Sequence, residues 1–256
     1  MSNYKFTMCP FCGSELVFEN INSNNNSPKI INTKSEEHII PKSLGNEKFV
    51  LPKGTICDKC NNYFALNIEK QFLEIESISI LRSYHLIPSR KNKVPAFNVL
   101  FCGDNAIMRY DKKTHSMIMD VKPETVLKLY SGEKPSYFFS KGIDTDELRN
   151  NYIVSRMLVK IFIEVYLYYS IIEMKQYENI NDDYNFVFDT KMKELINYVR
   201  YGKKDKIYEY TVQETKSIIP YSNDDFVASI DLTCDSNGLS GMVFKLFELQ
   251  FTLKIN

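Results

Sequence analysis

Four of the six cysteines in this 256-residue chain fall into two close pairs, CPFC at 9–12 and CDKC at 57–60. Two thiolates on one tight turn can bind two corners of a metal ion, and two such pairs complete the tetrahedron that Zn²⁺ prefers. The first residues lack the apolar core of a signal peptide, so the thiols are expected to stay reduced rather than form disulfides. The spacing therefore predicts a structural zinc site, against the alternative of four unrelated cysteines. Its ligands would be Cys9, Cys12, Cys57 and Cys60.

An acid, a histidine and an amide lie between and just after these pairs, in the strings EEHIIPKSLGN at 36–46 and CNN at 60–62. An unperturbed imidazole titrates near pH ~6.5, so His38 could accept a proton from water. The carboxylate of Glu37 and the amide oxygen of Asn61 are hard ligands that suit a divalent cation. A base and a cation are what hydrolysis of a phosphodiester needs. The alternative for His38 is a surface histidine or one that supports the zinc site.

These motifs resemble those of HNH endonucleases, of the kind with zinc knuckles around an E-H-I-I-P-K-S-L-G core and a C-x-x-C-N close. The resemblance covers residues 9–62. It implies a ββα-metal module that binds one catalytic divalent cation, Mg²⁺ or a similar ion. It also implies His38 as general base and Glu37 and Asn61 as ligands of that ion, with Asn62 as a substitute or supporting partner.

Two positions depart from the family's usual pattern. Most HNH nucleases have Asp where this chain has Glu37, and the carboxylate is therefore one methylene further from the backbone. The asparagine that braces the loop between the two strands usually lies nine positions before the last asparagine, where this chain has Pro52. Asn46 is the only other asparagine nearby, so the loop is expected to be braced differently.

Short elements are predicted around this motif. Residues 38–40 and 49–51 have strand character, a turn follows at 52–54, and a helix is expected to open at Cys57. Apolar periodicity then predicts a helix over 66–87.

The rest of the chain mixes strands and helices. Strands are predicted at 94–102, 105–110 and 115–121, the last two as a hairpin. Alternation at 226–234 and 247–255, with a DSNG turn at 235–238, predicts an antiparallel hairpin with one wet face. Cys102 and Cys234, in these runs, are expected to be buried small hydrophobes.

Residues 152–172 are expected to form a long central helix. Arg156, Lys160 and Glu164 recur every fourth residue and are predicted to share one face toward solvent or a groove.

We therefore predict an α+β protein with two parts. Residues 1–65 would form the zinc-stapled HNH module at the N-terminus. Residues 66–256 would form a larger α+β accessory or regulatory domain, with antiparallel strands and the long central helix, of no family that its sequence indicates.

Charge limits the partners. The chain has 32 Lys+Arg and 32 Asp+Glu, which excludes a wholly basic nucleic-acid-binding surface. Residues 1–62 contain seven Lys and six Asp+Glu, 7 − 6 = +1, and a zinc ion with four thiolates would add about −2. DNA affinity would then need the catalytic cation, other residues or a partner, either a regulatory protein subunit or a second copy in a homodimer. Phosphate contacts are predicted, against a solvated loop, for Lys42, Arg82, Arg90 and Lys91.

The sequence thus predicts a cytoplasmic, metal-dependent HNH endonuclease that cleaves DNA, in a setting such as restriction or anti-phage defence. The charged residues within 152–172 argue against a membrane span, and no phosphate-binding glycine loop indicates a nucleotide cofactor. Two alternatives stay open. One is a zinc-ribbon module with a decayed catalytic set that binds nucleic acid or a protein, and the other is an HNH nuclease that acts on RNA.

Overall fold

The structure is a computed structural model of the chain. It describes residues 7–16, 18–20, 28–30, 35–89, 91–133, 137–140, 142–176, 188–202, 206–215, 228–236 and 238–255. The chain forms two compact units. Unit 1 comprises Met1–Lys42, Asn46–Phe72 and Asn150–Asn256, and unit 2 comprises Ser43–Gly45 and Leu73–Arg149. The predicted N-terminal module thus lies in unit 1 except for three residues, and the boundary at residue 65 stays a prediction.

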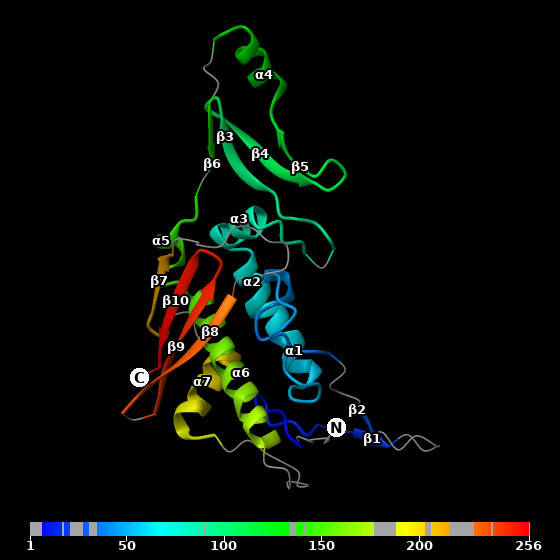
Figure 1. Ribbon diagram of the computed structural model, residues 1–256, viewed down its shortest axis with the longest axis vertical. Helices are drawn as coiled ribbons and strands as arrows, with labels where there is room; N and C mark the ends of the chain where they lie inside the picture. The colour runs from blue at the N-terminus through cyan, green and yellow to red at the C-terminus, as the bar shows by residue number, and fades with distance from the viewer. Residues whose placement is uncertain are drawn as a thin grey trace. The chain divides into compact units, whose positions relative to one another are not determined.

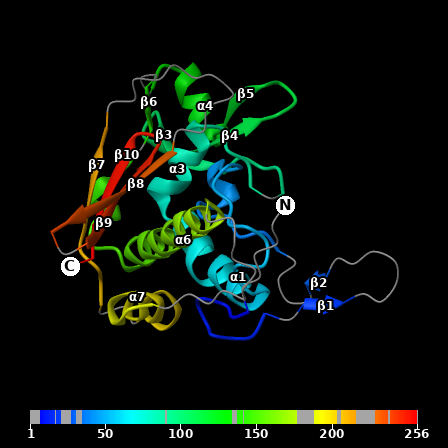
Figure 2. The ribbon, with the colours of Figure 1, turned by 60° about the horizontal axis from the view of Figure 1, so that its bottom comes forward.

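The centre of unit 1 is the long helix α6 (Tyr152–Gln176), as predicted. Every residue from 154 to 165 is buried, because α6 has neighbours on several sides. It packs against α7 (Thr190–Tyr201), the π-helical segment η2 (Ala65–Glu69) and strands β9 and β10. Figures 1 and 2 show α6 surrounded by these elements.

A four-stranded antiparallel sheet completes unit 1, in the order β7-β10-β9-β8. Its strands are β7 (Tyr210–Glu214), β8 (Ala228–Asp235), β9 (Gly238–Leu246) and β10 (Leu249–Lys254). Alternate residues of β10 are buried, which confirms the predicted period of two. The turn that joins β8 to β9 is at the predicted place, with Asp235 opposite Gly238. The run at 247–255 does not pair with β8, however, because β9, a strand the sequence did not predict, lies between them. Cys234, however, is exposed near the end of β8, so the prediction that it is buried was wrong.

The N-terminal part of unit 1 has little regular sheet. Strands β1 (Phe18–Asn20) and β2 (Pro28–Ile30) pair with each other. The two strands predicted at 38–40 and 49–51 reduce to one isolated bridge between His38 and Val50. The pairing stops there because Pro41 and the 3-10 turn η1 (Lys42–Leu44) follow Ile40 at once.

The helix predicted to open at Cys57 is present. It begins as α1 (Asp58–Phe64), continues through η2 and ends as α2 (Lys70–Leu73). The prediction of one helix over 66–87 was wrong, since α3 (Glu76–Tyr84) is a separate helix. Its start is fixed by the Glu147 carboxylate, which accepts hydrogen bonds from the backbone nitrogens of Glu76 and Ser77 at 3.2 and 2.9 Å.

Unit 2 contains a second antiparallel sheet, in the order β5-β4-β3-β6. Its strands are β3 (Phe97–Phe101), β4 (Asp104–Asp111), β5 (Ser116–Asp120) and β6 (Phe138–Ser140). The helices α4 (Pro123–Tyr130) and α5 (Thr145–Leu148) belong to the same unit. Ile80 of α3 packs on Phe97, Val99 and Ala106 of this sheet. The three strands predicted between 94 and 121 are therefore confirmed, and Cys102 is buried as expected.

The β1–β2 pair and both four-stranded sheets are antiparallel, and the described helices do not connect parallel strands, which confirms the α+β class. None of the helices formed by the described residues has the length and apolar character that a membrane crossing requires.

Candidate active site and zinc centre

The four paired cysteines converge in unit 1. Their sulfur atoms all lie within 4.8 Å of one another, and the Sγ–Sγ distances of Cys9 to Cys60 and of Cys12 to Cys57 are both 3.7 Å. The first pair lies on a tight turn closed by a 2.8 Å hydrogen bond from the Gly13 nitrogen to the Cys9 carbonyl. The second pair lies at the start of α1, where the Cys60 nitrogen bonds the Cys57 carbonyl at 3.0 Å. Four soft sulfur ligands around one point could hold a zinc ion.

Hydrogen bonds among the four cysteines shift the pKa values of Cys57 and Cys60. Hydrogen bonds from Cys60 and Cys9 lower the pKa of Cys57 to about 2, so one thiolate is favoured in the cluster even without an ion. The hydrogen bond with Cys57 and burial raise the pKa of Cys60. Burial of several thiolates at such distances needs a compensating cation, which is what a bound zinc would provide.

A positively charged side chain on α7, that of Arg200, contacts the cysteine cluster. Arg200 donates a hydrogen bond from Nη1 to Sγ of Cys60 at 2.8 Å, and its guanidinium lies 5.8 Å from the ring centroid of Tyr63. The Arg200 side chain is half-buried against this candidate metal ligand.

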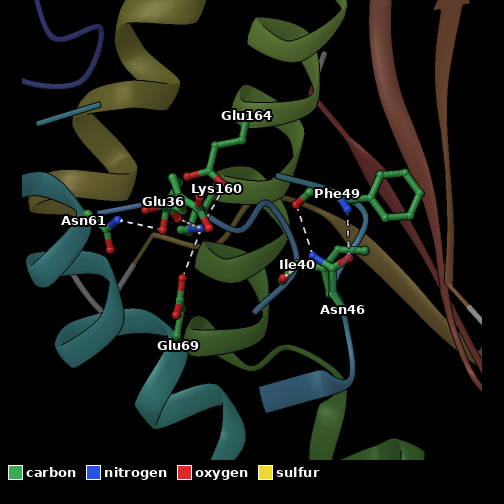
Figure 3. A network of polar contacts seen from close by, with 9 residues as sticks. Glu36, Ile40, Asn46, Phe49, Asn61, Glu69, Lys160 and Glu164 are labelled. Atoms are coloured by element: carbon green, nitrogen blue, oxygen red, sulfur yellow. Dashed lines mark hydrogen bonds and ion pairs between the residues drawn. The ribbon is translucent and has the colours of Figure 1, made fainter. Parts of the chain in front are cut away.

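The backbone on either side of the His38–Val50 bridge is braced by Asn46. This side chain has no exposed surface. Its Nδ2 donates to the carbonyls of Ile40 and Phe49 at 2.6 and 3.0 Å (Figure 3). Its Oδ1 accepts from the nitrogens of Lys48 and Phe49 at 3.0 and 2.9 Å. The bracing amide that Pro52 cannot supply is thus provided six residues earlier in the chain.

His38 lies on this braced segment and is partly buried. Its Nδ1 is buried and has no hydrogen-bond partner among the described residues. Burial, and then the positive charge of Lys42, lower the pKa of His38 below its ordinary value. The imidazole is therefore neutral, and able to accept a proton, over a wider range of pH than an ordinary histidine.

Asn61 brings α1 next to the same segment. Its Nδ2 donates to the carbonyl of Glu36, the residue before Glu37, at 3.2 Å (Figure 3). Because the amide nitrogen is committed to this bond, the amide oxygen is the atom left to act as a ligand. The structure thus brings Asn61 next to the segment that carries His38 and Glu37.

Glu37 is buried, with 5% of its side chain exposed, and forms an ion pair that the sequence did not predict. Its Oε1 accepts a 2.7 Å hydrogen bond from Nζ of Lys160, on α6. The same ammonium lies 2.8 Å from Oε2 of Glu164 and 3.2 Å from Oε1 of Glu69, on the π-helical segment (Figure 3). We call Glu37, Glu69, Lys160 and Glu164 the carboxylate–lysine cluster.

The prediction that the charged residues of α6 share a face toward solvent or a groove was wrong. Arg156 is 6% exposed, and Lys160 and Glu164 are not exposed at all. Arg156 instead donates from Nε to the carbonyl of Val199 at 2.9 Å, which joins α6 to the end of α7. Charged residues at this spacing are buried here because each has a partner.

The carboxylate–lysine cluster has excess negative charge. Burial raises the pKa of Glu37 and of Glu164, whereas burial of Lys160 is outweighed by its three carboxylates, which hold the lysine pKa well above the ordinary value. Glu37 Oε2 and Glu164 Oε1 are buried and receive no hydrogen bond from the described residues while both carboxyl groups are ionised. With Glu164 protonated, its carboxyl group is a hydrogen-bond partner of Glu37. Three carboxylates and one ammonium sum to −3 + 1 = −2 when all are ionised, so a proton or a cation is needed to neutralise them.

The residues predicted to contact phosphate have different environments. Lys42 is exposed and lies 3.7 Å from Glu47, and Lys91 is exposed. Arg82 is 6% exposed and donates from Nε to the Ser43 carbonyl at 2.8 Å, which does not favour a phosphate contact. Arg90 lies outside the described residues.

One comparison with known proteins agrees with the motif, the one with protein-family models. Residues 27–75 match the family model described as HNH endonuclease, which confirms the resemblance predicted from the sequence. The match includes Glu37, His38, Asn46 and Asn61. Neither the curated proteins nor the solved structures contain a match to this chain.

Proposed function

We propose that this chain, which carries an HNH endonuclease domain at residues 27–75, is a metal-dependent nuclease that hydrolyses phosphodiester bonds of DNA. The observation that carries the proposal is the 3.2 Å hydrogen bond from Asn61 to the Glu36 carbonyl. It holds an amide ligand beside the segment that carries a carboxylate and a partly buried histidine. A base, two oxygen ligands and a fixed backbone are thereby supplied by one small part of the chain.

In this proposal His38 is the general base. Its lowered pKa keeps the ring neutral near neutral pH, so that a ring nitrogen can take the proton of the attacking water. Asn46 fixes the loop that follows His38, which preserves the direction of the imidazole. Glu37 and Asn61 would hold a divalent ion such as Mg²⁺, which when bound neutralises negative charge on the phosphate.

The cysteine cluster is proposed as a structural zinc site. It joins the turn at Cys9 and Cys12 to the start of α1, from which Asn61 projects one residue after Cys60. A zinc ion there would fix the first turn of α1 and thus the position of the Asn61 amide. Both roles of metal, structural and catalytic, remain proposals drawn from the donor atoms.

The proposal also covers how the chain binds its substrate and the biological role of cleavage. The net charge of zero argues that the chain binds DNA with help, from the catalytic ion and from a regulatory subunit or a second copy. Exposed Lys42 and Lys91 are the described candidates for phosphate contacts. A cytoplasmic role in restriction or anti-phage defence is proposed by analogy alone.

A cleavage assay tests the proposal. Purified full-length protein is incubated with plasmid DNA, and separately with RNA, in Mg²⁺, Mn²⁺ or EDTA. We expect cleavage of DNA that needs the divalent ion and is lost in His38→Ala. The matched control is His115→Ala, an exposed histidine in unit 2 that contacts Tyr110. Cleavage that persists in His38→Ala would contradict the assigned base, cleavage of RNA alone would favour the RNA nuclease, and inactivity in every condition would favour the decayed binding module.

A further inference from the structure

We propose that Lys160 is a positioning residue for the metal site: it holds Oε1 of Glu37 and leaves Oε2 of the same carboxylate for the divalent ion. This inference rests on the proposed function, since it takes Glu37 as a metal ligand. It makes α6 part of the nuclease centre, although α6 lies outside the 27–75 segment that matches the family.

The contacts of Lys160 make it a fixed point. An ammonium has three N–H donors, and Lys160 has three carboxylate partners at 2.7, 2.8 and 3.2 Å. The side chain is completely buried, and its Nζ also lies 5.7 Å from the ring centroid of Phe64 in α1. Glu37, Glu69 and the Phe64 ring therefore fix the ammonium relative to the residue before His38, η2 and α1. Glu164 binds it from α6 itself.

Only one oxygen of Glu37 is used by this ion pair. Lys160 bonds Oε1, and Oε2, although it is buried, receives no hydrogen bond from the described residues while Glu37 and Glu164 are both ionised. A carboxylate whose rotation is blocked by one strong partner presents its second oxygen in a defined direction. The length of the side chain matters, because an aspartate would withdraw the carboxylate by about 1.5 Å, one C–C bond, and lose the contact with Lys160.

The ionised cluster has an excess negative charge that a bound cation would neutralise in place of a proton. The excess of −2 on the ionised cluster is equal and opposite to the charge of one divalent ion. Lys160 does not move aside to make room for that ion, because its departure would leave three buried carboxylates without a partner. Its role is therefore to hold Glu37 and not to compete with the ion for it.

Binding of Mn²⁺ to the full-length protein, measured by electron paramagnetic resonance in the absence of DNA, tests the inference. The variants are Lys160→Met, Glu37→Asp and the double variant. The matched control is Lys254→Met, because Lys254 forms an exposed pair with Glu209 at 2.9 Å, far from the cluster in sequence. We expect each single substitution to raise the Mn²⁺ concentration at half-saturation by about 10–100-fold, as loss of a group that orients a ligand does. The double variant should bind Mn²⁺ no more weakly than the weaker of the two single variants. The reason is that both substitutions break the same contact, between Lys160 and Glu37.

The outcomes separate this inference from the proposed function. Wild-type affinity in Lys160→Met would overturn the inference, and tighter binding would overturn it in favour of competition. If Lys160→Met does not fold, as judged by circular dichroism, Glu37→Asp decides alone, and wild-type affinity there overturns the inference. If the wild-type protein itself neither binds Mn²⁺ nor cleaves DNA, the proposed function fails. If it does both while the variants bind Mn²⁺ normally, only the role of Lys160 fails.

Discussion

Arg200 donates a hydrogen bond to the sulfur of Cys60 at 2.8 Å, across 140 positions of sequence. Cys60 lies in α1 and Arg200 near the end of α7, so the candidate zinc centre is contacted by a residue far outside the motif. A charged donor on a thiolate offsets part of the −2 charge that four thiolates leave on a zinc ion. The carboxylate–lysine cluster is similar, because Lys160 from the C-terminal half of the chain pairs with Glu37 from the N-terminal part.

Arg200→Met should weaken zinc binding about tenfold, because the substitution keeps an apolar stem and removes the donor to Cys60. Zinc transfer to a coloured chelator, followed at equilibrium, measures the change. Arg149→Met is the matched control, since Arg149 forms an exposed pair with Asp146 in unit 2. An Arg200→Met protein that retains zinc as tightly as wild type would show that the hydrogen bond contributes nothing to the centre.

Zinc should be present at about one ion per chain, and its removal should unfold the N-terminal part of unit 1. Metal binding is folding free energy in such sites, because the unfolded chain has no preformed tetrahedron. Elemental analysis gives the metal content, and circular dichroism with a chelator follows the loss of structure. Cys57→Ser should lose the ion, whereas Cys234→Ser, at an exposed lone cysteine, should not. Equal zinc content in both variants would exclude the four-cysteine site.

Asn46→Ala should lower the free energy of unfolding by about 3 kcal/mol, because it leaves buried backbone groups without partners. The groups concerned are the carbonyl of Ile40 and the nitrogens of Lys48 and Phe49. The Phe49 carbonyl keeps its 2.9 Å hydrogen bond from the Ile39 nitrogen. Urea denaturation measures the change, with the exposed Asn62→Ala as the control. Cleavage should fall in Asn46→Ala even where the protein remains folded, since the braced loop directly follows the segment that carries His38. Equal stability of the two variants would contradict the bracing role.

The local features of the site could be predicted from the sequence, and the long-range ones could not. The cysteine pairs, the helix at Cys57 and the β8–β9 turn each depend on residues close together in the chain. The burial of Lys160 was not predicted, because lysine, arginine and glutamate are almost never fully buried unless they are paired. Its partner Glu37 lies 123 positions away, so no spacing rule could reveal the pair.

The break between α2 and α3 was also missed because it depends on a residue far away in the chain. The apolar periodicity continues across residues 74 and 75, and only the carboxylate of Glu147, about 70 positions away, caps the new helix. Asn46 shows the opposite case. It was visible as the only nearby asparagine, but the resemblance placed the brace at Pro52, and only the structure shows which amide reaches the loop.

The pH dependence of cleavage should show a lowered pKa for His38. Burial and the charge of Lys42 favour the neutral ring, so the base remains unprotonated to a lower pH than an ordinary histidine near pH ~6.5. Activity should therefore fall on the acid side only below that value, and a bound divalent ion would move the pKa in the same direction. The measurement is kcat/KM against pH at saturating Mn²⁺. Lys42→Met should move the acid limb upward, and Lys254→Met, the exposed control, should leave it in place. An acid limb above the ordinary histidine value would show that His38 is not the titrating base.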